Sequence, residues 1–106
     1  MGYIAHHAIV VTGYGEDISE ARDEAARLGL NVSSIVGPVV NGYSSFLVAP
    51  DGSKEGWEHS DSGNAKRHAF IMWLRPRHYH WAEVRYSPDD DDAKVTRHAW
   101  DTGTEE

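Results

Sequence analysis

The chain has 106 residues, of which 17 are acidic and 10 are basic, so its formal net charge is -7 at pH 7. This length predicts a single domain over residues 1–106, and the acidic balance makes nucleic acid an unlikely partner because unspecific binding depends on lysine and arginine. The absence of cysteine excludes disulfides, thiolate metal sites and thiol nucleophiles. No apolar run reaches the roughly 18 residues of a membrane helix, and the first residues lack the pattern of a secretion signal. We therefore expect a cytoplasmic protein without a membrane partner.

The first predicted elements are a strand and a helix. Residues 3–12 are rich in β-branched and aromatic side chains, and the consecutive apolar residues 9–11 predict a central strand that is covered on both faces. A capping-box arrangement that begins at Asp17 and apolar side chains at helical spacing then predict a helix over 17–28. Gly29 is expected to end this helix in a left-handed conformation.

The next segment predicts a β-hairpin. Residues 32–40 and 43–49 are rich in strand-forming side chains, and Asn41-Gly42 between them favours a two-residue turn with two positive φ angles. Gly37-Pro38 interrupts the first arm. Because proline donates no hydrogen bond to a ladder, this arm is expected at a sheet edge or at a bulge.

The rest of the chain predicts a second helix and two strands. The helix extends from an N-cap within 60–62 to a stop just before Pro76, and strands over 79–86 and 94–100 precede a disordered tail at 101–106. The apolar face expected for this helix consists of Ala65, Ala69, Phe70, Trp73 and Leu74. The whole order, β-α-β-β-α-β-β, predicts an α+β fold of the ferredoxin-like split β-α-β type (βαββαβ) with an extra C-terminal strand, its helices on one face of an antiparallel sheet.

Seven histidines are the main candidates for chemistry. In the predicted topology the first strand neighbours the fourth, and the fourth pairs with the fifth, so several histidines could approach one another. They are His6 or His7, His78, His80 and His98. Three imidazoles could bind zinc, but no HExxH-type spacing is present, which favours histidines scattered over a half-exposed sheet. No serine lies in a GxSxG or SxxK context and no P-loop is complete, so we assign no catalytic residue, metal ligand or cofactor.

A basic cluster gives a second alternative around the second helix and the strand after it. It consists of Lys66, Arg67, Arg75, Arg77 and Arg85. With Tyr79 and Trp81 nearby, these side chains could hold a nucleotide or RNA on the sheet. A helix needs a solvated face in any case, and arginine near a helix C-terminus complements the dipole, so the structural interpretation is favoured.

The most unusual segment is the polar stretch Asp51–Gly63, DGSKEGWEHSDSG. A loop of this length inside a small domain is commonly functional or disordered. Its single large aromatic, Trp57, is either an exposed binding residue or a plug that folds back onto the sheet, which the large gain from burying tryptophan favours. The candidate binding residues are Lys54, Trp57, Glu58 and His59. The acidic run 89–92, expected at the tip of the 87–93 connection, is a candidate element for steering a partner.

Two phrases, YIAHHAIVVTG and NGYSSFLVAPDGSKEGWEHSDSGNAKRHAF, resemble short uncharacterised proteins of actinobacterial bacteriophages and prophages. The resemblance carries no assigned activity, and it implies a small accessory protein that acts in the host cell cytoplasm by binding a host factor. We therefore predict a non-enzymatic module that binds a host or phage protein without a cofactor, and a homodimer is compatible with the sequence. The alternative is a small metal-dependent or nucleotide-acting enzyme that uses the histidines on the sheet.

Overall fold

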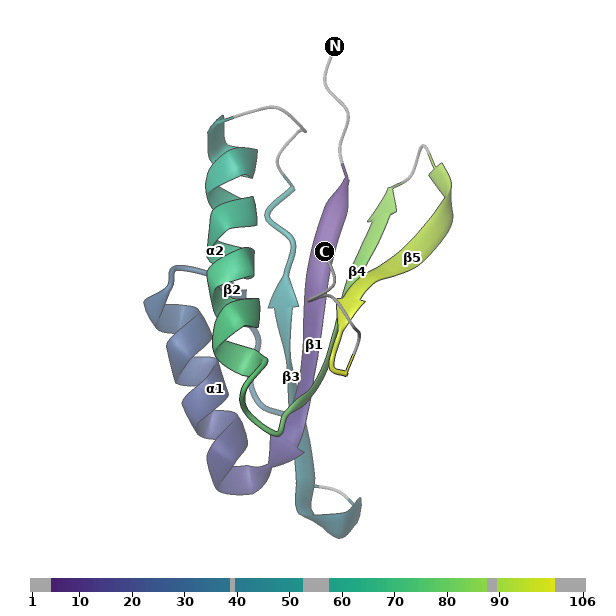
Figure 1. The fold of residues 1–106 in the computed structure, drawn as a ribbon. Helices are drawn as coiled ribbons and strands as arrows, with labels where there is room; N and C mark the ends of the chain where they lie inside the picture. Colours follow the sequence, from purple (N-terminus) through teal and green to yellow (C-terminus); the bar gives the residue numbers. More distant parts are fainter. Residues whose placement is uncertain (1–4, 39, 53–57, 88–89, 101–106) are drawn as a thin grey trace.

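The computed structural model describes residues 5–38, 40–52, 58–87 and 90–100. In chain order its elements are β1 (His6–Tyr14), α1 (Gly15–Arg27), β2 (Asn31–Val32), the 3-10 turn η1 (Val40–Gly42), β3 (Tyr43–Ala49), α2 (Glu58–Leu74), β4 (His80–Ser87) and β5 (Asp90–His98). The five strands form one antiparallel sheet in the order β2-β3-β1-β4-β5. Both helices lie side by side on one face of this sheet (Figure 1). The predicted α+β class is confirmed, as are the predicted neighbours of the first and fifth strands.

β1 is the central strand of the sheet, but only one of its faces is covered by described elements. Ile9 and Val11 are fully buried against the helices, whereas Val10 between them is 45% exposed. Successive side chains of a strand point to opposite faces, so the apolar run does not show that both faces are covered. The prediction of a strand buried on both faces is wrong.

α1 is amphipathic, as its apolar spacing predicts. Its buried side chains are Ile18, Ala21 and Ala25. Gly29 follows with a φ of 89° and its N–H bonds back to the carbonyl of Ala26, which confirms the predicted left-handed end. The predicted N-cap is wrong, because the helix begins at Gly15 and Tyr14 takes the cap position in an extended conformation. Asp17 lies instead in the first turn, where its charge complements the helix dipole.

The segment before β3 departs from the predicted hairpin. Asn41 and Gly42 do adopt the positive φ angles of a tight turn, 61° and 77°. β2 has only two residues, however, and among the described residues the pairing continues as one isolated bridge between Val36 and Ser45. Pro38 has no N–H to donate, so the ladder cannot continue through it toward the turn. The predicted first arm is therefore wrong in its extent.

α2 begins at Glu58, earlier than predicted, and ends before Pro76, as predicted. The polar stretch Asp51–Gly63 is therefore not one loop, because its last six residues belong to the first turns of α2. A negative charge at this end of a helix is favoured by the dipole, and Glu58 and Asp61 supply it.

The buried face of α2 also differs from the predicted one. Its fully buried side chains are Phe70, Ile71 and Leu74. Ala65 and Ala69 are exposed, so their predicted place in the core is wrong. At helical spacing the buried stripe continues toward the N-terminus through Lys66 and Arg67. Polar side chains occupy the stripe there because Arg67 binds a buried carboxylate of the sheet, Glu83.

β4 and β5 form a hairpin whose register shifts at two points. Ser87 pairs with Asp90, so the connection between the two strands is shorter than the predicted 87–93. Positions 90–92 of the acidic run are therefore part of strand β5 and not of a loop tip. β5 is an edge strand of the sheet, and charged residues are common on edge strands because they discourage pairing with other chains.

The core lies between the sheet and the two helices. Trp81 is buried there, and the half-buried ring of Trp73 stacks on the rings of Phe70 and Tyr79. Tyr79, directly before β4, is also buried, and its hydroxyl donates a hydrogen bond to the backbone oxygen of Asp17 (2.6 Å). Gly13 leaves room for this ring, since a Cβ at Gly13 would lie 3.0 Å from the ring of Tyr79. In the part of the chain that the structure describes, neither helix has the length and apolar character of a membrane span.

Candidate functional site

The face of the sheet opposite the helices is the first candidate site. The pairing of the strands determines which side chains lie on this face. Val10 pairs with Leu47 and with Ala82, and Ala82 pairs with His98. Paired residues of an antiparallel sheet point to the same side. The described side chains that define this open face are His6, Ala8, Val10, Thr12, Tyr14, Tyr43, Ser45, Leu47, His80, Ala82, Val84, Tyr86, Val95 and His98. None of them is Asp, Glu, Lys or Arg.

The middle of the open face is aliphatic and accessible to solvent. Val10 is 45% exposed, Leu47 37% and Val95 53%. They come from β1, β3 and β5, and the small side chains of Ala82 and Val84 on β4 lie between the first and last of these strands. Single exposed apolar residues are normal on a protein surface, but a contiguous group of them marks an interaction site.

Rings form a row at one end of the open face. Tyr14 and Tyr43 are stacked with their centroids 4.6 Å apart, Tyr43 lies 5.6 Å from His80, and His80 lies 5.2 Å from Trp100. Trp100 is 76% exposed and has a φ of 65°, a conformation that L side chains seldom adopt. At the other end His6 and Tyr86 are 5.2 Å apart. The open face is therefore aliphatic in the middle and aromatic at both ends.

A cleft of about 330 Å³ adjoins the row of rings. It is lined by Gly13, Tyr14, Asp17, Glu20, Tyr43, Pro76, Arg77, His78, Tyr79 and His80. Burial and the nearby carboxylates of Glu20 and Asp17 raise the pKa of Tyr79 to about 12, so this phenol is neutral over the physiological range. The cleft combines acidic, basic and aromatic groups and gives no single preference for the charge of a ligand.

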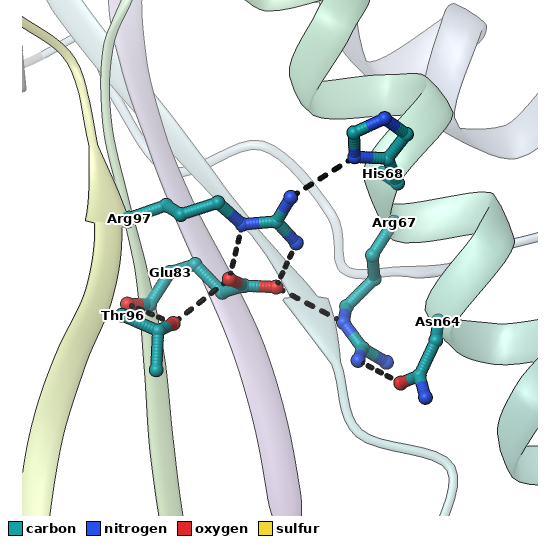
Figure 2. Close-up of polar contacts among 6 residues, drawn as sticks. All are labelled: Asn64, Arg67, His68, Glu83, Thr96 and Arg97. Atoms are coloured by element: carbon teal, nitrogen blue, oxygen red, sulfur yellow. Dashed lines mark hydrogen bonds and ion pairs between the residues drawn. The ribbon is translucent and has the colours of Figure 1, made fainter. Parts of the chain in front are cut away.

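On the helix side of the sheet, a buried carboxylate holds two arginines. Glu83 accepts hydrogen bonds from Nε of Arg67 (3.1 Å), from Nε and Nη2 of Arg97 (2.8 and 3.0 Å) and from the hydroxyl of Thr96 (2.8 Å) (Figure 2). Arg67 also donates to Asn64, and Arg97 donates to His68 (3.2 Å). The cluster ties α2 to β4 and β5, the two strands that follow this helix in the chain.

The environment of Glu83 suits a structural role. Burial raises the pKa of its carboxyl, but the hydrogen bonds from Arg97, Thr96 and Arg67 outweigh burial and hold that pKa below its ordinary value. The side chain is 3% exposed and both oxygens are occupied by donors. A carboxylate that is ionised, saturated with hydrogen bonds and closed to solvent cannot reach a substrate to act as a general base.

The predicted binding residues lie mostly outside the described part of the chain. Lys54 and Trp57 are not among the described residues, and neither is the side chain of His59. Glu58 is exposed at the first position of α2. Whether Trp57 is exposed or plugs the core therefore stays a prediction, as does the binding role of all four residues.

The structure does not bring the predicted histidines together. His6, His80 and His98 lie on the open face, His7 points to the helix side, and His78 precedes β4. Among the described residues, no group of three or more His, Asp or Glu side chains is placed to hold a metal ion.

The basic residues do not form one patch either. Arg77 stacks 3.9 Å from the ring centroid of Trp73, Arg75 lies 5.3 Å from that of Trp81, and Arg67 binds Glu83. Tyr79 and Trp81 are each only 5% exposed, so they are not available to stack on a base. The interpretation of these arginines as a nucleotide site has no geometric support among the described residues.

Sequence reasoning missed both the open face and the Glu83 cluster. Glu83 lies two residues after the buried Trp81, and alternation along a strand predicts that both point to the same side. A charged residue at a core-facing position requires a partner, which was a usable signal.

No protein family, no curated protein and no solved structure matches this chain.

Proposed function

We propose that this protein is a non-enzymatic binding module that uses the open face of its sheet to bind another protein. The observation that carries the proposal is the uncovered aliphatic centre of this face, where Val10, Leu47 and Val95 are exposed on three strands. Covering such a surface removes apolar area from water, which stabilises a complex by about 25 cal/mol per Å² before the costs of association.

The polar groups support binding rather than catalysis. Glu83 is saturated by arginine and threonine donors, and the hydroxyl of Tyr79 is occupied by a backbone oxygen. The described side chains of the open face offer hydroxyl groups and imidazoles but no carboxylate. A nucleophile held beside an oriented base, which catalysis would need, is not found among the described residues.

Three finer predictions accompany this proposal. The fold is a ferredoxin-like split β-α-β arrangement in which β5 extends the sheet; the central position of β1 between β3 and β4 supports it. A host or phage protein is bound in the host cell cytoplasm, which rests on the resemblance to phage proteins. The segment that carries Lys54 and Trp57 contacts that protein at a site separate from the open face, which rests on its composition.

A cysteine probe tests the proposal, because the chain has no cysteine of its own. A thiol introduced by Val10→Cys lies on the open face, and one introduced by Ser19→Cys lies on the exposed surface of α1 as a matched control. We expect maleimide labelling of the first thiol, and not of the second, to slow either in cell extract or in concentrated pure protein, because each condition supplies a protein that can cover the open face. Equal labelling of Val10→Cys in buffer, in extract and in concentrated pure protein would refute an open-face binding module.

A further inference from the structure

We infer that the partner of the open face is a second copy of this chain, so that the protein is an isologous homodimer joined sheet to sheet. The inference rests on the proposed function, and it adds the identity of the partner and the symmetry of the contact. An isologous interface uses the same patch on both copies, and it therefore requires a patch that is compatible with itself in charge, size and shape.

The charge of the open face fits a second copy. The chain has a net charge of -7, yet none of the side chains that define the open face carries a formal charge. Among the described side chains of this face a basic partner would find no carboxylate with which to pair, whereas a neutral apolar surface would meet its like. Over these described side chains, face-to-face contact of two copies buries no ionised carboxylate, so it avoids the cost of desolvating a charge.

The size of the open face suits a weak dimer. The four longer strands have seven to nine residues each. With strands about 4.8 Å apart and a rise of about 3.3 Å per residue, they span about 19 Å by about 26 Å, or about 500 Å² of flat area. Upright side chains make the accessible area larger than the flat area. The result approaches the lower limit of specific interfaces, about 600 Å² per partner, where weak and transient complexes are found.

The shape of the sheet places the symmetry axis. β1 is the middle strand of five (Figure 1). Val10 is the middle residue of β1. When two identical faces meet, the two-fold axis lies in the plane between them, and the residue at the centre of the patch meets its own copy. We therefore expect Val10 of one copy to lie opposite Val10 of the other, with Leu47 and Val95 around it.

The chain itself offers two other occupants, which the experiment separates from a second copy. Residues 101–106, DTGTEE, are polar and acidic, so they do not complement an apolar face. The second is the ring of Trp57, which lies outside the described residues and would compete with a second copy if it covered the open face of its own sheet. If it did, Trp57→Ala would increase self-association instead of leaving it unchanged.

Sedimentation equilibrium of the purified full chain is the first test. We expect a monomer–dimer equilibrium in the micromolar range for the wild type and for Trp57→Ala. Val10→Glu should raise the dissociation constant by about tenfold or more, because symmetry places two like charges opposite each other. Ser19→Glu adds the same charge to the exposed surface of α1 and should leave dimerisation unchanged. Leu47→Glu, on another strand of the face, should repeat the effect if Val10→Glu folds poorly.

Cross-linking locates the axis and separates the inference from the proposed function. A short bismaleimide should join two copies of Val10→Cys but not two copies of Ser19→Cys. A monomer at every concentration, or a dimer that Val10→Glu and Leu47→Glu do not weaken, would overturn the inference. If the pure protein stays monomeric while cell extract protects the thiol of Val10→Cys, the binding module stands and its partner is a different protein.

Discussion

Replacement of Glu83 by glutamine tests the buried cluster that joins α2 to β4 and β5. The carboxylate accepts three hydrogen bonds from arginines at 2.8–3.1 Å and one from Thr96 at 2.8 Å. A neutral amide turns one acceptor into a donor and leaves the guanidinium groups of Arg67 and Arg97 without a counter-charge.

The magnitude follows from the burial of the three side chains. Breaking a fully buried ion pair costs about 3–5 kcal/mol, but the side chains of Arg67 and Arg97 are 12% and 29% exposed and recover part of their hydration. We expect Glu83→Gln to lower the free energy of unfolding by about 3 kcal/mol, which corresponds to about 12 °C in the melting temperature of a domain of this size.

Urea denaturation at neutral and acidic pH is the appropriate assay. The pKa of Glu83 in the folded state lies below its unfolded value, so the stability from this carboxylate is present above about pH 4.3 and is lost as the pH falls through the folded pKa. The difference between wild type and Glu83→Gln should therefore shrink in acid. Glu24→Gln is the matched control. Glu24 also binds an arginine, but this arginine, Arg27, is 68% exposed, so the change should affect stability little.

Two results would refute this reasoning. One is a Glu83→Gln protein whose unfolding free energy lies within about 0.5 kcal/mol of the wild type, the usual range for surface substitutions. The other is a difference between the two proteins that does not depend on pH. Either result would mean that the cluster is hydrated in solution and does not hold α2 on the sheet.

Three further substitutions test the core and the open face. Tyr79→Phe removes the hydrogen bond to Asp17 and should lower the free energy of unfolding by about 1 kcal/mol at pH 7. Because the pKa of the Tyr79 phenol is raised to about 12 in the folded state, the stability that this phenol contributes should be lost as the pH rises from about 10 to that value. Tyrosinate absorbance during unfolding follows this loss. Gly13→Val would press on the ring of Tyr79, whose atoms lie 3.0 Å from an added Cβ, and should lower the unfolding free energy in urea by about 1–3 kcal/mol; an unchanged midpoint would contradict the packing. Trp100→Ala should leave that midpoint nearly unchanged, because the side chain is 76% exposed, but should weaken self-association about tenfold in sedimentation; no weakening would place Trp100 outside the interface.

The local features of the chain were predictable because their causes are local. Gly29 ends α1 since glycine tolerates a positive φ, and Pro76 ends α2 since proline cannot continue a helix. Asn41 and Gly42 take positive φ angles for a similar reason. The element order and the α+β class follow from such signals together with apolar spacing.

Contacts between distant segments decided the rest. The run 9–11 is apolar at every position, so its spacing cannot tell which faces of the strand are covered, and only the placement of both helices on one side leaves Val10 exposed. The inner stripe of α2 shifts from Ala65 and Ala69 to Lys66 and Arg67 because a carboxylate 16 residues further along the chain binds that arginine. Local conformation depends on neighbours in sequence, whereas burial and ion pairing depend on neighbours in space. The candidate site of this protein is made by residues that are neighbours in space.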